Sequence, residues 1–595
     1  MNPKVYIKKN WFNILLNIVL GSVCLLGIYT SFFMNSVNRA LALDEAILAV
    51  DFTQRSLTNL TESVFSWNQS APAGWLYIVK IIAMLFGHTE YVYRLFSVIS
   101  YVGVLVMLYI TAKKVLRMEY PIIPCAFVAS MEFILKYSNI FKPYMADAMF
   151  VLLVLYLFYL YEEKKINYIV LAVFWALLLW FSNPVCFVEG GLILAQVLFS
   201  CGAKVWNKLK EILIVTATIV MSFVVYYFYW LREVAQGDTM QNYWADRRFP
   251  LIINSEADLE LVKELVDIIY VHFGYSGKFM LIMTGVAFII AIAKKNKYVI
   301  GIYFGIFVSL FASSISMFPI SDRLWLFYYP LISLVVFGVF ESLEIRDVST
   351  KFVKCILGLI CILLVISNQG IQKYKEKENV YWLVHETNLQ YEYLEEHMDS
   401  DAGLYVYSLS SPGFRFKNGY DNIYFKDNTK KIIFGTSSLE VLDEQADKEI
   451  EAIRSRKKCY IMLSGKTASQ TELLQKELCN DGFLELVHNE YYTPIYYYCA
   501  DVKDSKVSVE IESLWRDEKD GMTKELIKIH NTGMAYINHK YEKMYLVDEK
   551  NNIYIEIPEN IKPGECKEFG ISYQGGVEPN FSLASEYRII GSVKK

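Results

Sequence analysis

Residues 11–45 read WFNILLNIVLGSVCLLGIYTSFFMNSVNRALALDE, an apolar run that begins near Phe12 and is followed by an acidic pair, Asp44 and Glu45. A helix of roughly 23 apolar residues is long enough to cross the hydrocarbon core of a bilayer, which is ~30 Å thick. The run is too long for a removable signal peptide and lacks a small-residue cleavage site before the charged loop. The stretch therefore predicts a permanent membrane span followed by a polar loop.

Similar apolar stretches recur through the first 370 residues. They are roughly 17 to 23 residues long and start near residues 12, 89, 119, 144, 167, 184, 211, 277, 298, 324 and 353. Hydrophobic residues make up 54% of the chain and the mean hydropathy is +0.28, values that are too high for an ordinary soluble enzyme. We predict a polytopic α-helical membrane protein, with about eleven transmembrane helices over residues 1–371.

Basic residues predict which ends of these spans face the cytoplasm, because cytoplasmic loops are enriched in lysine and arginine. The N-terminal tail and every second loop are basic, through Lys4, Lys8, Lys9, Lys113, Lys114, Arg117, Lys164, Lys165, Lys204, Lys208, Lys210, Lys294, Lys295, Lys297, Arg346, Lys351 and Lys354. With an odd number of crossings, we expect a multi-pass protein of the cell membrane with a cytoplasmic N-terminus. The segment after residue 371 is then extracytoplasmic.

The last 224 residues or so predict two soluble domains, since no apolar run in them could span a bilayer. Residues 372–503 alternate helix-like segments with short apolar strands, such as LEVLDEQADKEIEAIRSR (439–456) and KCYIMLSG (458–465), which predicts an α/β domain. Residues 504–595 show period-two strands, as in KVSVEIESLW (506–515), which predicts a β-sandwich.

Several classes of function are disfavoured by composition. The net charge of −4 comes without a basic stripe, so nucleic acid is not an expected partner. The ten cysteines form no C-x-x-C motif, and neither a dinucleotide fingerprint nor a phosphate-binding P-loop is present. For the soluble half, a gating or packing role is therefore favoured over a second active site.

The acidic pair in the first predicted outer loop allows two interpretations. Asp44 and Glu45 begin an apolar helix-forming segment close to the membrane, where adjacent carboxylates suit a general base and a partner that holds an acceptor or a metal. The alternative is that the pair caps the N-terminus of a helix, with Glu45 solvated. The pair alone does not decide between them.

The other outer loops carry candidate phosphate ligands. Arg94 stands at the outer end of a span, where it either contacts an anionic head group or extends to the interface. Lys142 and Tyr144 could bind a phosphate while Asp147 holds one of them by ion pairing, although a structural Lys142–Asp147 salt bridge explains the same residues.

A late loop, SISMFPISDRLWLFYYP (314–330), places Asp322 and Arg323 directly before an apolar helix. A guanidinium offers two parallel donors to a phosphate, and the short connection restricts where Arg323 can reach. The alternative is a local pair between Asp322 and Arg323, with interfacial anchoring by Trp325 and Tyr328.

Taken together, residues 10–370 resemble the GT-C superfamily of membrane glycosyltransferases, in the branch that is similar to protein O-mannosyltransferases and lipid A aminoarabinose transferases (glycosyltransferase family 39-like). Five strings in the same order carry the resemblance: the Asp44–Glu45 pair, Q-S-A-P at 69–72, R-L-F-S at 94–97, K-P-Y-x-x-D at 142–147 and F-P-x-S-D-R-L at 318–324.

The resemblance implies an inverting transferase that takes a sugar from a polyprenyl-phosphate donor in the outer leaflet and passes it to an extracytoplasmic glycan, lipid or protein. It implies Asp44 as the base with Glu45 beside it. It also implies that the donor phosphate is bound by Lys142, Tyr144, Arg323 and Arg94. Asp147 and Gln69 would support these ligands.

Metal binding stays open at this stage. Some relatives bind a divalent ion near the acidic pair, partly through histidine, but neither His88 nor His272 lies in a ligand-spaced motif. We therefore assign no cofactor from the sequence and leave open a divalent cation bound by carboxylates.

Two other classes of membrane protein also have many spans and buried charged residues. A secondary transporter should show internally repeated halves and interrupted helices near the midplane, and no repeat is evident. A catalytically silent scaffold or sensor would use the helices to hold the outer domains. It predicts that Asp44→Asn leaves function intact, whereas the enzyme interpretation predicts near-complete loss.

Overall fold

The structure is a computed structural model that describes residues 3–203, 205–235, 242–341, 362–363, 365–419, 431–465, 467–540, 542–585 and 589–592. Its contacts divide the chain into two units. The first comprises Met1–Arg39 and Ile47–Leu383, and the second comprises Ala40–Ala46 and Val384–Lys595. The short segment Ala40–Ala46, which includes Asp44 and Glu45, therefore belongs by its contacts to the C-terminal half of the chain.

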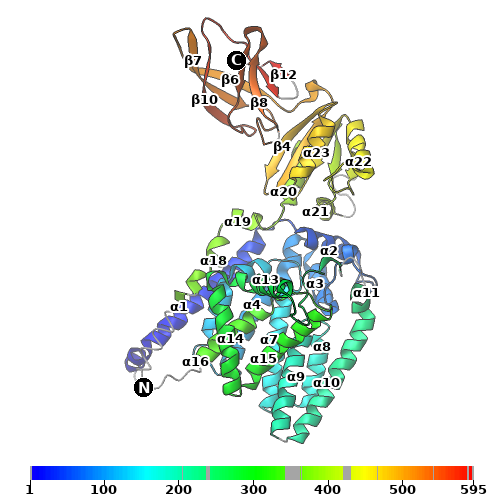
Figure 1. Cartoon of the computed structure of the whole chain (residues 1–595), viewed down its shortest axis with the longest axis vertical. Helices are drawn as coiled ribbons and strands as arrows, with labels where there is room; N and C mark the ends of the chain where they lie inside the picture. Colours follow the sequence, from blue (N-terminus) through cyan, green and yellow to red (C-terminus); the bar gives the residue numbers. More distant parts are fainter. Residues whose placement is uncertain are drawn as a thin grey trace. The chain divides into compact units, whose positions relative to one another are not determined.

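The first unit is helical (Figure 1). Its described helices are α1 (Pro3–Ser36), α2 (Leu43–Gln54), η1 (Ser66–Asn68), α3 (Ala73–Phe86), α4 (Glu90–Lys114), α5 (Ile122–Ser130), α6 (Glu132–Tyr137), α7 (Tyr144–Glu162), α8 (Tyr168–Leu178), α9 (Val185–Gly202), α10 (Trp206–Tyr226), η2 (Tyr227–Leu231), α11 (Arg232–Ala235), α13 (Glu256–Tyr270), η3 (Val271–Ser276), α14 (Gly277–Ala293), α15 (Lys297–Ser314), α16 (Tyr328–Glu341), α18 (Gly370–Lys373) and α19 (Lys377–Tyr381). The first turn of α2, residues 43–46, is the part assigned to the second unit.

Seven helical segments in the described residues are long and apolar enough to cross a membrane. They are Asn13–Ser36, Glu90–Lys114, Tyr144–Glu162, Val185–Gly202, Trp206–Leu231, Glu256–Ala293 and Lys297–Ser314, and α3, α8 and most of α16 are shorter apolar helices. The predicted fold class, a polytopic helical membrane protein followed by α/β and β-rich parts, is confirmed. The predicted count of about eleven spans is not confirmed, and the span expected near residue 353 lies outside the described residues.

The span predicted near residue 119 is interrupted. Met131 adopts an extended conformation, with φ −67° and ψ 126°, and separates α5 from α6. The interruption frees the carbonyl oxygen of Phe127, which accepts hydrogen bonds from Asn368 at 3.1 Å and from the Ser130 hydroxyl at 2.9 Å. Broken helices in membrane proteins need such substitute partners. Because Asn368 lies 241 residues away, the break could not be read from the local pattern.

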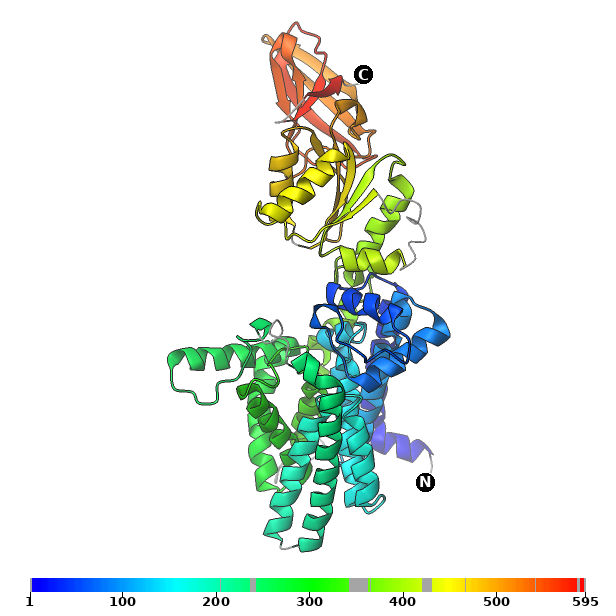
Figure 2. The same ribbon diagram turned by 90° about the vertical axis from the view of Figure 1, so that its right-hand side faces the viewer.

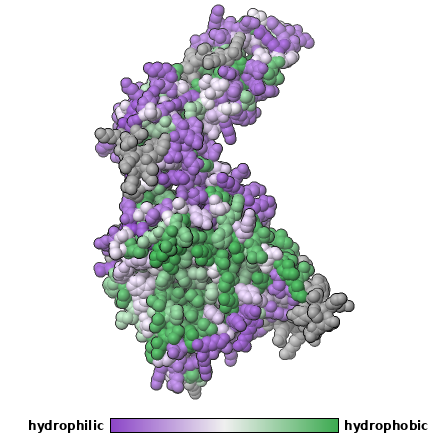
Figure 3. Space-filling view, turned by 180° about the vertical axis from the view of Figure 1, so that it is seen from behind, coloured by the Kyte–Doolittle hydropathy of each residue, from purple (hydrophilic) through white to green (hydrophobic). Residues whose placement is uncertain are grey.

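The outer surface of the helices is apolar, as expected for contact with lipid tails. Large hydrophobic side chains are exposed on α10, η2 and α14, among them Leu213, Met221, Phe228, Ile282 and Ile289. Figure 3 shows such side chains gathered into a broad hydrophobic area on the helical unit. A soluble protein rarely exposes an apolar area of this kind, so the surface supports a multi-pass membrane protein.

Small residues allow α9 and α15 to approach closely. A Cβ atom added at Gly191 would lie 2.2 Å from the carbonyl oxygen of Gly301 and from the backbone nitrogen of Gly305. Glycines that let two helix backbones meet are typical of helix packing within membranes. These two helices form part of the framework behind the loops described below.

One long loop of the first unit contains an amphipathic helix, α13. Ser255 and Asp258 form a capping box at its N-terminus, and a kink at Gly274, with φ +60°, separates it from α14. Figure 2 shows α13 lying across the direction of the long helices. The helix therefore belongs to the loop rather than to the span that follows, and its C-terminal end contributes to a cavity.

The second unit contains three sheets. Their strands are β1 (Gly403–Val406), β2 (Ile432–Phe434), β3 (Lys458–Met462), β4 (Phe483–Glu490), β5 (Thr493–Cys499), β6 (Val509–Lys519), β7 (Met522–Asn531), β8 (Met544–Asp548), β9 (Ile553–Glu556), β10 (Cys566–Gln574), β11 (Ser582–Ser585) and β12 (Ile589–Ser592). The strand orders are β2-β1-β3-β5-β4, β10-β7-β6 and β12-β11-β8-β9. In the first sheet β1 pairs in parallel with β2 and β3, whereas the pairings of the other two sheets are antiparallel.

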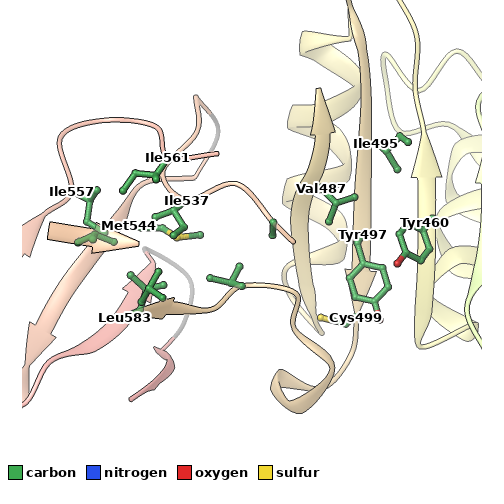
Figure 4. Close-up of a cluster of buried hydrophobic side chains, with 14 of the residues drawn as sticks. Tyr460, Val487, Ile495, Tyr497, Cys499, Ile537, Met544, Ile557, Ile561 and Leu583 are labelled. Atoms are coloured by element: carbon green, nitrogen blue, oxygen red, sulfur yellow. The ribbon is translucent and has the colours of Figure 1, made fainter. Parts of the chain in front are cut away.

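Helices accompany the first of these sheets. They are α20 (Thr387–His397), α21 (Ser411–Lys417), α22 (Glu444–Ser455) and α23 (Ala468–Leu478), with the short η5 (Val502–Asp504) and η6 (Glu549–Asn551) elsewhere in the unit. Alternate strand residues point to opposite faces, so Tyr405 packs in the core with α22 and α23, while Leu404 packs in the core with α20. The second core continues into the β-rich part, where Met544 and Ile561 join the same cluster as Tyr497 (Figure 4).

Candidate active site

The first unit contains a cavity of about 570 Å³. Four parts of the chain meet there: the end of α6, the segment just after residue 241, the junction of α13 with η3, and the loop before α16. The lining residues are Tyr137, Tyr243, Trp244, Asp246, Arg247, Ile268, Val271, His272, Ser321, Asp322 and Arg323. Aromatic walls with a few charged groups suit a ligand that is partly apolar and partly anionic.

Asp322 is held through both carboxylate oxygens. Its Oδ2 lies 3.0 Å from Nε2 of His272, and its Oδ1 accepts from the backbone N–H of Arg323 at 2.7 Å and from the Ser321 hydroxyl at 3.0 Å. Burial alone would raise the pKa of Asp322, but these hydrogen bonds and the nearby His272 lower it to about 2. Asp322 therefore stays ionised, in a fixed position, across the physiological pH range.

His272 is fixed by packing as well as by this bond. Its ring stacks on Phe133, with ring centroids 3.8 Å apart and planes 22° apart, and it lies edge-on to Tyr329. These contacts leave the imidazole little freedom to rotate away from Asp322. The pair joins η3 to the loop before α16 and so sets the shape of the cavity between them.

Replacing His272 with phenylalanine is expected to keep the stacking and to lose the hydrogen bond to Asp322. The pKa of Asp322 then rises, and the protein loses about 1–2 kcal/mol of stability at pH 5. Because the folded-state pKa is lowered, the carboxylate stabilises the fold above about pH 4 and this contribution disappears as the pH falls toward about 2. Thermal unfolding of wild type and variant between pH 5 and pH 2.5 measures the difference.

The Asp322→Asn background provides the control for this prediction. There, His272→Phe should change the unfolding temperature by the same amount at every pH in the range, because the titrating carboxylate is gone. A pH-dependent difference that persists in the Asp322→Asn background would show that another group is responsible.

Arg323 is one of two guanidinium groups at the cavity. Its Cζ lies 5.4 Å from the centroid of the Trp244 ring, a cation–π contact that orients the planar group. The other, Arg247, lies 3.7 Å from Oε1 of Glu264 on α13. Planar guanidinium groups are well suited to bidentate recognition of phosphate. The cavity can therefore receive an anionic group against Arg323.

Lys142 and Gln69, two of the residues chosen from the sequence, are in contact. Nζ of Lys142 donates to Oε1 of Gln69 at 2.5 Å, and only 5% of the lysine is exposed. Tyr144, the first residue of α7, packs edge-on against Tyr137, which lines the cavity. The structure thus links Tyr144 to the cavity wall and gives Lys142 an amide neighbour.

Arg94 and Asp147 are both buried. Arg94, on α4, is 1% exposed and donates from Nη1 to the carbonyl oxygen of Arg39 at 2.7 Å, so it neither extends to the interface nor lies at the surface. Asp147, on α7, is 6% exposed, and its Oδ1 has no hydrogen-bond partner in the described part of the chain. The supporting role of Asp147 stays a prediction.

The acidic pair lies in the segment assigned to the second unit. Glu45 is fully buried, and its Oε2 accepts from the backbone N–H of Ala42, just before α2, at 2.8 Å. This is the carboxylate arm of a capping box, so Glu45 caps the helix, but it is buried and not solvated as the capping interpretation expected. Asp44 is half-buried on the first turn of α2. Catalytic roles for the pair remain predictions.

Metal binding also remains a prediction. Among the described residues, no group of three or more His, Cys, Asp and Glu side chains is placed to hold a metal ion. His272 and Asp322 are the right donor types for a divalent ion but supply only two donors, fewer than a structural or catalytic site needs. We therefore derive no chemical step through a metal.

Sequence reasoning found Arg323 but missed the groups that surround it. His272 lies in no ligand-spaced motif, and for Asp322 a local pair with Arg323 was one of two interpretations. Fifty residues separate His272 from Asp322, so spacing gives no signal for their contact. Trp244 and Arg247 had one available signal: they lie in a polar, aromatic stretch of a long predicted outer loop.

Comparisons with known proteins give structural likenesses only. No protein-family model and no curated protein sequence matches the chain. Similar solved structures include ArnT from Cupriavidus metallidurans bound to undecaprenyl phosphate (10% identity, 81% of this chain and 97% of that chain, TM-score 0.47) and the same protein in the apo state (10%, 82% and 98%, 0.46). A third is the apo form of the Archaeoglobus fulgidus oligosaccharyltransferase (9%, 98% and 98%, 0.48). ArnT, a lipid A aminoarabinose transferase, and the oligosaccharyltransferase belong to the GT-C superfamily, which the sequence motifs of this chain resemble.

Proposed function

We propose that this protein is a membrane glycosyltransferase that moves a sugar from a polyprenyl-phosphate donor to an extracytoplasmic acceptor, with inversion at the anomeric carbon. The cavity at Arg323 carries the proposal. It combines a guanidinium oriented by Trp244 with aromatic walls, in a unit whose helices have the length and apolar surface of membrane spans. A phosphate attached to both a sugar and a lipid chain matches that combination of polar and apolar surfaces.

The chemistry needs an acid–base group and a cation. The acceptor hydroxyl oxygen attacks the anomeric carbon while its proton passes to the Asp44 carboxylate. The bond from the anomeric carbon to the phosphate oxygen breaks, and the polyprenyl phosphate leaves with the electron pair. Arg323 stabilises the charge that grows on the leaving phosphate, with Lys142 and Tyr144 as further ligands. Attack opposite the leaving group inverts the configuration.

The stereochemical outcome tests this mechanism. With a polyprenyl-phosphate sugar of known anomeric configuration, NMR of the isolated product should show the opposite configuration, with one polyprenyl phosphate released for each sugar transferred. A product that retains the donor configuration would exclude the single displacement and with it the role given to Asp44.

The proposed orientation places the N-terminus in the cytoplasm and the second unit outside. Basic residues at the N-terminus and in alternate loops support this orientation. Two exposed cysteines report on it: Cys566 in the second unit and Cys201 at the end of α9. A membrane-impermeant maleimide applied to intact cells should label Cys566 and spare Cys201, with the Cys566→Ser and Cys201→Ser variants identifying each signal. The reverse pattern would contradict the orientation.

A further inference from the structure

Within the second unit, a buried contact joins the segment that carries the acidic pair to residues after 384. The backbone N–H of Ala40 donates to both carboxylate oxygens of Glu386, at 2.9 and 3.0 Å. Ala40 is fully buried and Glu386 is 1% exposed, so water does not compete for this bond. A backbone N–H bonded to a buried carboxylate is a charge-assisted contact and is stronger than a neutral one.

Glu386 itself is anchored to the core of the second unit. It is the residue before α20, and its side chain makes no bond to that helix. One turn later, Nε2 of Gln390 donates to the carbonyl oxygens of Leu463, just after β3, and of Pro494 in β5, at 2.7 and 3.0 Å. Thr387 packs so tightly against Gly413 that an added Cβ there would lie 2.5 Å from its hydroxyl oxygen. The start of α20 is therefore held in a fixed position on the sheet.

The other end of this contact leads directly to the candidate base. Ala40 lies four residues before Asp44, and the turn between them is closed by the bond from Ala42 N–H to Glu45. The backbone N–H of Ala46 continues the helix by donating to the carbonyl oxygen of Ala42 at 2.7 Å. With both ends of so short a segment fixed, the position of the Asp44 backbone is restricted.

We propose that Glu386 is a positioning residue, through which the second unit holds the Asp44-bearing segment in its working place by binding the backbone of Ala40. This inference rests on the proposed function, in which Asp44 is the base. It gives residues 384–595 of the second unit a part in catalysis, although the proposed base comes from the segment Ala40–Ala46. A base must lie within hydrogen-bond reach of the proton that it removes, and a shift of about 1 Å costs on the order of 10²-fold in rate.

Three variants test the inference. Glu386→Ala removes both acceptors of the Ala40 N–H, whereas Glu386→Gln keeps one amide oxygen in the same place. Glu485→Ala is the matched control, because Glu485 is also 1% exposed and accepts a backbone N–H, that of Lys506 at 2.7 Å, elsewhere in the second unit. The control thus damages the same unit to a similar degree without touching Ala40.

Two readouts separate the contact from the reaction. In hydrogen–deuterium exchange, Glu386→Ala should speed exchange of the peptide containing residues 40–46 by about tenfold or more, while Glu386→Gln and Glu485→Ala leave it near wild type. In transfer assays, Glu386→Ala should lower kcat by about 10²-fold with little change in KM for the donor, and Glu386→Gln should restore most of the rate.

Each outcome decides one point. Unchanged exchange in Glu386→Ala would overturn the anchoring contact itself. Faster exchange with wild-type kcat, or an equal loss of kcat in Glu485→Ala, would overturn positioning. If the wild-type protein transfers no sugar, the proposed function fails and the positioning role fails with it, yet the exchange result still reports whether Glu386 holds the segment.

Discussion

Asp44→Asn is expected to lower kcat for sugar transfer by about 10²–10⁴-fold, the usual contribution of a general base. The asparagine keeps the size of the side chain and its place on the first turn of α2, but at neutral pH its amide cannot accept the proton of the acceptor hydroxyl. Donor binding should be unchanged, because Asp44 is assigned to the acceptor and not to the phosphate. Steady-state kinetics and a donor-binding titration of the purified variant measure the two effects separately.

Two neighbouring carboxylates provide the controls. Asp51→Asn changes a carboxylate further along the same helix, one that accepts the backbone N–H of Ser66, and should leave kcat within about threefold. Glu45→Gln should weaken the cap on Ala42 and therefore lower the unfolding temperature. Its effect on kcat should be smaller than that of Asp44→Asn. If Asp44→Asn retains wild-type turnover, Asp44 is not the base.

Arg323→Ala is expected to reduce kcat/KM for the donor by about 10²–10³-fold, since it removes the guanidinium that stabilises the leaving phosphate. Arg323→Lys should recover only part of this loss. Lysine restores the positive charge but lacks the planar group that lies over Trp244. Kinetics with a fixed acceptor and varied donor give the three values to be compared.

The Trp244→Phe variant refines the same prediction. A phenyl ring is a weaker cation–π partner than indole, so Arg323 should be oriented less firmly and kcat/KM should fall by a smaller factor than in Arg323→Ala. Equal kcat/KM for wild type and Arg323→Ala would remove Arg323 from the phosphate site and leave the cavity without its assigned role.

Features that neighbouring residues determine could be predicted from the sequence, whereas features that depend on residues far apart in the chain could not. Span-length apolar runs predicted a helical membrane protein, because the bilayer imposes a length that each helix must satisfy locally. The break at Met131 was not predictable, since its freed carbonyl oxygen is satisfied by Asn368, far along the chain. The α3 helix, by contrast, begins directly after Pro72, and proline is common at the start of helices.

The candidate site shows the same limit. Arg323 could be selected because its own neighbours restrict it to a short loop, whereas His272 and Trp244 come from other loops and reach the cavity only through the fold. The acidic pair looked like part of the first outer loop. Its segment belongs to the second unit, where the Ala40 N–H donates to Glu386, 346 residues away, and no local pattern encodes that contact.

The most direct test of the central claim is transfer of radiolabelled sugar by the purified full-length protein in nanodiscs, with a panel of polyprenyl-phosphate sugars and beside Asp44→Asn. We expect label to move from at least one donor to an acceptor, or slowly to water, with the wild-type protein and not with the variant. No turnover of any donor by a folded sample, with glycan, lipid and peptide acceptors present, would contradict the proposed glycosyltransferase and favour a scaffold or a transporter.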